Sequence, residues 1–176
     1  MQSISALTAL LVACSDRRRI LRVKLSAGSL GALVSSNGHG SNGFVRILVV
    51  DDHEQFRNFV TSTLRKQPHL QVIAEAQDGP EGLQRAEALQ PDLVLLDIGL
   101  PTMNGIEAGR QIRKAAPNTK IVFLTQESSQ EMVEAAFGLG ASGYVVKGRA
   151  GEELLKAVQS VMEGKQFESS GLREPR

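Results

Sequence analysis

The chain has 176 residues, of which 41% are hydrophobic and 22% are charged, which suits one globular domain with some extra length and excludes a wholly disordered protein. The net charge is +1, but residues 1–43 hold five basic residues and one acidic residue, leaving fifteen basic and eighteen acidic residues in the remainder. This acidic balance gives the remainder no electrostatic reason to bind phosphate backbones, so we expect no direct contact with nucleic acid. The single cysteine, Cys14, excludes an internal disulfide and fits a reducing, cytoplasmic location.

The first 43 residues carry few signals. The apolar run from Ile4 to Ala13 is too short to span a bilayer, and no Lys or Arg precedes it as a secretory signal would require. The three glycines between Asn37 and Gly43 have GxGxxG spacing, but they precede a predicted strand instead of following one. We therefore predict a flexible extension at residues 1–43 with no membrane association, a folded domain at residues 44–166 and a short C-terminal tail at residues 167–176.

From residue 44 onward, apolar runs of strand length alternate with apolar residues at helical spacing. The runs predict strands at residues 45–50, 70–74, 93–96, 121–124 and 143–146. Helical spacing predicts one helix after each strand, indicated by the apolar residues within 56–64, 83–89, 106–112, 132–139 and 154–162.

The fourth of these helices has its own start signal. Ser128 and Glu131 have the spacing of a capping box, so we expect Ser128 to cap this helix. The residues expected to face the core are Met132, Ala135, Ala136 and Leu139.

Five strands alternating with five helices predict an α/β fold in which a parallel sheet is covered by helices on both faces, with right-handed crossovers. Among the doubly wound arrangements we favour the flavodoxin-like one, a five-stranded parallel sheet with strand order 2-1-3-4-5.

Polar residues stand where four of the predicted strands end. Asp51 and Asp52 follow the first strand, Asp97 follows the third, Thr125 the fourth and Lys147 the fifth. Asp97 alone could equally be a cap of the following loop. Because the carboxyl ends of neighbouring parallel strands meet at one edge of the sheet, we expect these side chains to converge. Four polar strand ends rarely meet at one edge by chance, so the convergence indicates a functional site.

Four segments of the chain carry a family resemblance. ILVVDDHEQFR, LVLLDIGLPTMNG, IVFLTQESS and GYVVKG resemble, in order and spacing, the signature segments of the receiver domain of two-component response regulators, over residues 44–164. The Asp-Asp-His start and the segment GKQFESSGL are most similar to the branch that usually carries a LuxR-type helix-turn-helix output domain. About a dozen residues follow the last predicted helix, fewer than such a domain needs, so we expect a stand-alone or truncated receiver.

This resemblance implies a phosphoacceptor and a metal site. Asp97 would accept a phosphoryl group from a sensor histidine kinase or a phosphotransfer protein. The ion would be Mg2+, with Mn2+ as an alternative, held directly by Asp52, Asp97 and the backbone carbonyl of Gly99, while Asp51 acts through water. Hard divalent cations prefer such oxygen ligands, and they relieve the repulsion among crowded carboxylates.

The resemblance also assigns the remaining strand-end residues. Lys147 would neutralise charge on the phosphoryl oxygens, and Thr125 would hydrogen-bond one of them. Tyr144 occupies the aromatic switch position and would turn inward as Thr125 moves. A tyrosine on an edge strand that merely packs on a helix is the alternative interpretation.

Three residues depart from the common family pattern or invite another interpretation. Gln126 stands where many members carry a small residue, which predicts restricted access to the phosphoryl group and slow turnover. Gly148 replaces the proline often found after the lysine. His53 adjoins the acidic pair, but we expect it to begin the first helix instead of binding a transition metal.

The favoured function is a phosphorylation-switched signalling module that acts through an unknown output protein or as a homodimer. It would not be an enzyme, beyond assisting its own phosphorylation and dephosphorylation. A phosphotransfer enzyme of the haloacid-dehalogenase type would need a second Asp two residues after Asp97, where Gly99 stands. The other alternative is a fragment of a DNA-binding transcriptional regulator whose helix-turn-helix domain lies outside this sequence.

Overall fold

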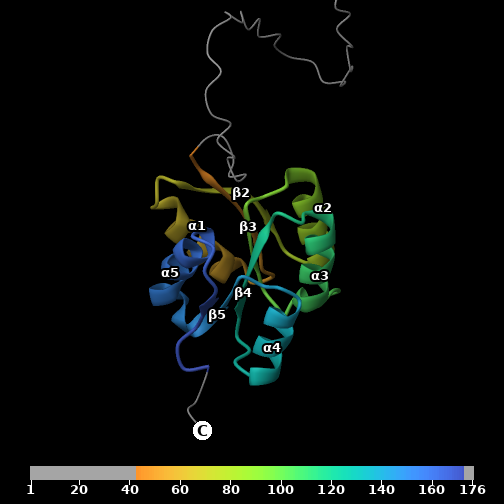
Figure 1. Cartoon of the computed structure of the whole chain (residues 1–176). Coiled ribbons are helices and arrows are strands. Elements are labelled where there is room, and N and C mark those ends of the chain that lie inside the picture. Colours follow the sequence, from red (N-terminus) through yellow and green to blue (C-terminus); the bar gives the residue numbers. More distant parts are fainter. Residues whose placement is uncertain (1–42, 173–176) are drawn as a thin grey trace, which may run out of the picture. The chain divides into compact units, whose positions relative to one another are not determined.

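The computed structural model describes residues 43–172 of the chain. Strands and helices alternate along it (Figure 1). The strands are β1 (Val45–Val50), β2 (Leu70–Ala76), β3 (Leu93–Leu96), β4 (Lys120–Thr125), β5 (Gly143–Val146) and β6 (Phe167–Glu168). The helices are α1 (Glu54–Arg65), α2 (Gly79–Leu89), α3 (Gly105–Ala115), α4 (Gln130–Gly138) and α5 (Ala150–Met162), with a single 3-10 turn, η1 (Lys147–Arg149), before α5.

All six strands form one parallel sheet in the order β2-β1-β3-β4-β5-β6. The predicted flavodoxin-like, doubly wound fold and its strand order 2-1-3-4-5 are confirmed. The sixth strand was not predicted. It pairs Phe167 with Gly143 and Glu168 with Tyr144, and it lies in the stretch expected to be a tail. Two residues are too few to produce a periodic pattern in a sequence.

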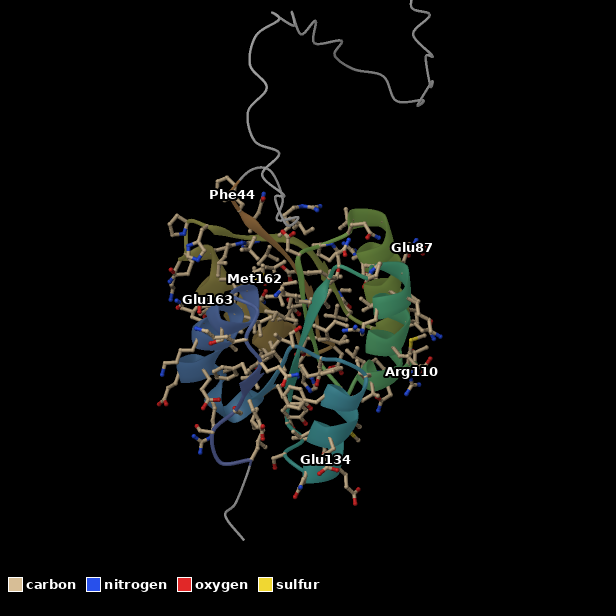
Figure 2. All side chains as sticks on the ribbon, in the orientation of Figure 1. Phe44, Glu87, Arg110, Glu134, Met162 and Glu163 are labelled. Atoms are coloured by element: carbon tan, nitrogen blue, oxygen red, sulfur yellow. The ribbon has the colours of Figure 1, made fainter. Side chains whose placement is uncertain are left out.

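Helices cover both faces of the sheet (Figure 1). On one face, α1 and α5 pack over Ile47 and Val49 of β1, whereas α2, α3 and α4 pack with Leu48 and Val50 on the other. Successive strand residues point to opposite faces, so a sheet covered on both sides needs apolar residues at every position. This explains why the predicted strands are continuous apolar runs. The outer faces of α2, α3 and α4 carry exposed charged side chains such as Glu87, Arg110 and Glu134 (Figure 2).

Helix starts agree with local sequence in two cases and differ in one. Asp78 caps α2 by accepting a hydrogen bond from the N–H of Glu81 at 2.8 Å. Asn104 caps α3 by accepting one from the N–H of Ile106 at 2.7 Å. The capping box predicted for α4 is wrong. Its cap residue is Ser129, without a side-chain hydrogen bond, so Glu131 stands one position too early to reach back to the cap.

The inward face of α4 also differs from the expectation. Val133 and Ala136 are its buried residues, Met132 and Leu139 are partly buried, and Ala135 is exposed. The error arises because apolar residues occupy most positions of this short helix, so the pattern alone does not select one face.

No helix within residues 43–172 is both long enough and apolar enough to cross a bilayer. The flexible extension predicted at residues 1–43 lies, except for Gly43, outside the described residues, as do residues 173–176 of the predicted tail. The proposed division of the chain therefore stays a prediction.

Candidate functional site

The sheet places four polar residues at one edge. Asp51 directly follows β1, Asp97 follows β3, Thr125 is the last residue of β4, and Lys147 directly follows β5. These strands are consecutive neighbours in the sheet, so the chain leaves all four at the carboxyl edge. Open α/β sheets bind their ligands at this edge.

Lys147 joins two of the carboxylates. Its Nζ lies 2.8 Å from Asp51 Oδ2 and 2.7 Å from Asp97 Oδ2, and 4.8 Å from the centre of the Phe56 ring. Burial alone would lower the pKa of Lys147, but its hydrogen bonds and charge attraction to Asp51 and Asp97 outweigh burial and raise the pKa. The ammonium therefore stays charged between the two acids.

Four residues form an acidic cluster at this edge, namely Asp51, Asp52, His53 and Asp97, each of which offers one ligand atom within 4.8 Å of the others. Asp51 and Asp97 are buried, whereas Asp52 and His53 are exposed. Burial raises the pKa of Asp51 above its usual range, and the hydrogen bond and charge of Lys147 only partly oppose this. Asp51 therefore depends on the Lys147 ammonium to hold its charge at this buried position.

His53 stands at the N-cap position where α1 begins, as expected from the sequence, but its side chain makes no cap hydrogen bond. Its backbone N–H donates to Asp51 Oδ1 at 2.9 Å, and its Nδ1 lies 2.7 Å from Asp52 Oδ1. The imidazole is 60% exposed, so water can replace its contact with Asp52. His53 therefore helps to shape the turn between β1 and α1.

The donor atoms of the acidic cluster fit a hard divalent cation. Three carboxylates face one ammonium, and Mg2+ prefers oxygen ligands while keeping several waters. Asp51 Oδ2 is buried, and among the described residues its one donor is the Lys147 ammonium at 2.8 Å, which leaves a lone pair of this oxygen without a protein partner. An under-satisfied buried carboxylate oxygen is a suitable partner for a metal-bound water.

The loop after β3 packs tightly against Asp97. The N–H of Gly99 donates to Asp97 Oδ1 at 3.2 Å, and a Cβ at this glycine would make only an ordinary contact, 3.8 Å from Asp97 Oδ2. At Gly105, a Cβ would lie 1.9 Å from the carbonyl oxygen of Asp97, so only glycine lets the start of α3 approach so closely. Gly105 therefore lets the start of α3 lie directly against the backbone of Asp97.

Thr125 and Tyr144 meet at Glu127. Thr125 Oγ1 accepts a hydrogen bond from the N–H of Glu127 at 3.2 Å, and the Tyr144 hydroxyl donates to its carbonyl at 3.0 Å. Tyr144 is fully buried, and its ring centre lies 6.5 Å from that of Phe123. It does not lie on an edge strand, because β6 pairs with β5.

Two residues beside the cluster were not predicted from the sequence. Phe56 lies under the Lys147 ammonium, and Arg57 donates a buried hydrogen bond at 2.7 Å to the carbonyl of Asp51. The available signal for Arg57 was its spacing, because it stands three and seven residues before the buried Val60 and Leu64, on the inward face of α1.

Comparisons with known proteins identify the family of this chain. The profile of the family described as the response regulator receiver domain matches residues 47–159. The chain belongs to this family, whose members are the signalling phosphoacceptors of two-component systems. Receiver domains of this kind are phosphorylated by histidine kinases and pass the signal to an output domain.

Two curated relatives come from the expected LuxR/NarL branch. The nitrate/nitrite response regulator protein NarL of Escherichia coli strain K12 is 36% identical over 126 residues, which cover 72% of this chain and 58% of NarL. The transcriptional regulatory protein DegU of Brevibacillus brevis is 33% identical over 120 residues, or 68% of this chain and 51% of DegU. The chain thus spans little more than half the length of these relatives.

Solved structures show the same similarity. A LuxR-family two-component response regulator from Aurantimonas sp. SI85-9A1 is 33% identical with a TM-score of 0.70, and the match covers 73% of this chain and 92% of that one. The signal receiver domain of a NarL response regulator from Mycobacterium tuberculosis is 31% identical with a TM-score of 0.66, covering 69% and 98%.

Proposed function

We propose that Asp97 is the phosphoacceptor of this receiver domain and that a sensor histidine kinase or a phosphotransfer protein is the donor. The observation that carries this proposal is the Lys147 ammonium, held 2.7 Å from Asp97 Oδ2 and 2.8 Å from Asp51 Oδ2 at the carboxyl edge of the sheet. A buried carboxylate beside a fixed cation can receive a phosphoryl group whose negative charge is then neutralised where it arrives.

The transfer forms one bond to phosphorus and breaks another. A carboxylate oxygen of Asp97 attacks the phosphorus, and the bond from phosphorus to the donor's imidazole nitrogen or acyl oxygen breaks. The donor leaves with that electron pair. Lys147 stays protonated throughout and shifts its contacts from the carboxylate toward a phosphoryl oxygen, and the hydroxyl of Thr125 donates to another.

Asp52, Asp97 and the carbonyl of Gly99 would hold Mg2+ or Mn2+ directly, with Asp51 acting through a water. The cation supplies positive charge for the incoming phosphoryl oxygens. The under-satisfied Asp51 Oδ2 and the clustered carboxylates support this assignment. Asp52 has a side chain that is 31% exposed, which leaves it free to turn toward an ion that keeps part of its hydration shell.

Intact-mass measurement after incubation with acetyl phosphate tests the proposal. We expect one phosphoryl group with Mg2+ present, and none with excess chelator or in Asp97→Asn. The matched control is Asp92→Asn, which changes a carboxylate at the opposite end of β3 that accepts from the N–H of Arg46. Labelling of Asp97→Asn at the wild-type level would refute both the residue and the chemistry.

The output of the switch has two candidates. One is a protein contact, including a homodimer, made by the surface of α4, β5 and α5 beside Thr125 and Tyr144. The other is control of DNA binding by a further domain, because the relative DegU is named a transcriptional regulatory protein and the chain covers 51% of it. A longer reading frame, assayed for DNA binding with and without phosphorylation, separates them.

A further inference from the structure

Arg57 is a buried cation beside the acidic cluster that the proposed phosphotransfer does not use. It lies in the first turn of α1, and its side chain is only 9% exposed. Its Nη1 donates to the carbonyl oxygen of Asp51 at 2.7 Å, and its Nε donates to Glu75 Oε2 on β2 at 3.3 Å. One guanidinium therefore links α1, β2 and the turn that carries the acidic pair.

Both backbone groups of Asp51 are held by hydrogen bonds. The N–H of Asp51 donates to the carbonyl of Ala76, the last residue of β2, at 3.1 Å. Arg57 holds the carbonyl on the other side of the same residue. The peptide group between Asp51 and Asp52 is thus fixed at its oxygen, and this peptide sets the directions in which both side chains leave the backbone.

We propose that Arg57 is a positioning residue for the divalent cation, which acts through the Asp51 carbonyl and not through the ligand carboxylates. Asp51, Asp52 and Asp97 repel one another, so the turn gains electrostatically if the exposed Asp52 rotates away. Arg57 opposes this rotation at the peptide oxygen. The inference rests on the metal site in the proposed function.

The geometry separates positioning from charge neutralisation. Arg57 contacts a neutral carbonyl and is paired with Glu75, whereas Lys147 contacts the carboxylates themselves. Loss of the Arg57 bonds should therefore weaken cation binding while the phosphotransfer rate at saturating Mg2+ stays near that of the wild type. Loss of Lys147 should lower that rate directly.

The experiment measures the Mg2+ dissociation constant by calorimetry for the full chain, Arg57→Met and Arg57→Lys, together with acetyl phosphate labelling rates across Mg2+ concentrations. We expect Arg57→Met to raise the dissociation constant about tenfold, equivalent to about 1.4 kcal/mol. Arg57→Lys should be intermediate, because lysine lacks the planar fork that serves two acceptors at once. Half-maximal labelling should move to higher Mg2+ in the same proportion, with a maximal rate close to wild type.

Arg46→Met is the matched control. Arg46 also donates to backbone carbonyls, those of Leu89 and Gln90 at 2.8 and 2.9 Å, but at the opposite end of β1. The Arg46→Met variant should have a lower free energy of unfolding but the Mg2+ affinity of the wild type. If Arg57→Met is folded and binds Mg2+ as wild type does, the inference is overturned while the proposed function stands.

Two further outcomes are decisive. If Arg57→Met does not fold, the test rests on Arg57→Lys. A Mg2+ dissociation constant of Arg57→Lys equal to that of the wild type then overturns the inference. Absence of Mg2+ binding in the wild-type chain would instead overturn the metal site of the proposed function.

Discussion

The hydroxyl of Tyr144 donates a hydrogen bond to the carbonyl of Glu127 at 3.0 Å, across the loop that leaves β4. The N–H of the same Glu127 is held by Thr125 Oγ1 at 3.2 Å. One loop residue therefore connects the two side chains that the family resemblance assigns to the switch. A movement of the Thr125 hydroxyl toward a phosphoryl oxygen would release the Glu127 N–H and change the acceptor that Tyr144 uses.

Thr125→Ala should separate phosphorylation from signalling. We expect Asp97 still to be labelled, because Lys147 and the acidic cluster remain, whereas the loop response should be lost. The Glu127 N–H loses its acceptor, worth about 0.5–1.5 kcal/mol, so its hydrogen exchange should be faster even without phosphorylation. Exchange of residues 126–160 with and without beryllofluoride measures the response. Equal protection changes in wild type and variant would contradict this mechanism.

Tyr144 should titrate late. Burial, followed by the charges of Glu127 and Asp97, raises the pKa of Tyr144 to about 12. A raised folded-state pKa means that the stabilising contribution is complete below the unfolded value near 10 and is lost as the pH rises through about 12. The chain has one tyrosine and no tryptophan, so tyrosinate absorbance reports this residue alone. A folded-state midpoint equal to that of denatured chain would show that the phenol is not buried.

Lys147→Met should make stability depend on the cation. Removing the ammonium leaves Asp51 and Asp97 buried without their partner, which costs about 3–5 kcal/mol in metal-free protein. Mg2+ should restore part of this loss if it binds the folded state at the proposed site, since a ligand of the folded state alone stabilises it. The control is Lys120→Met, which removes a lysine bonded to the Val161 carbonyl at 2.7 Å, far from the cluster. Denaturation with and without Mg2+ gives the comparison, and equal stabilisation of both variants would contradict the prediction.

Glu153 anchors the segment after β6. It is buried and accepts hydrogen bonds from the hydroxyls of Ser169 and Ser170. Burial alone would raise the pKa of Glu153, but these bonds outweigh burial and lower it below its usual 4.5.

We expect Ser169→Ala to lower the free energy of unfolding by about 1–3 kcal/mol at neutral pH. A lowered folded-state pKa means that this stabilisation is present above pH 4.5 and is lost as the pH falls through the folded value. Urea denaturation of wild type and variant over a pH series measures it. A difference between the two proteins that does not shrink in acid would show that the Glu153 charge is not involved.

Sequence patterns predicted the strands and helices, because each depends on the spacing of apolar residues within a short segment. The apolar runs before Asp51, Asp97 and Lys147 are long enough to reveal strands, and their connection through helices restricts the sheet to few arrangements. The convergence of the three residues then followed from parallel topology alone. The topology does not give the distances between these side chains, such as the 2.7 Å from Lys147 Nζ to Asp97 Oδ2.

The remaining features depend on tertiary contacts that leave little local signal. Arg57 is an ordinary charged helix residue until its Asp51 and Glu75 partners, six and eighteen positions away, are known. Likewise, the bond that anchors the segment after β6 joins Ser169 to Glu153 of α5, sixteen positions earlier. The capping box predicted at Ser128 shows the converse, because the local pattern is present while the helix begins one residue later, after Ser129.

The two edges of the sheet bear on whether separate molecules can join by strand addition. An open edge strand offers unpaired backbone groups on which another chain can pair and polymerise. Here one edge ends in β6, whose two residues are too short a template. The other edge, β2, has seven residues, but its register against β1 shifts between Ile47 and Leu48. Such an irregularity twists an edge strand away from a flat partner. Neither β2 nor β6 therefore favours the addition of strands from other molecules.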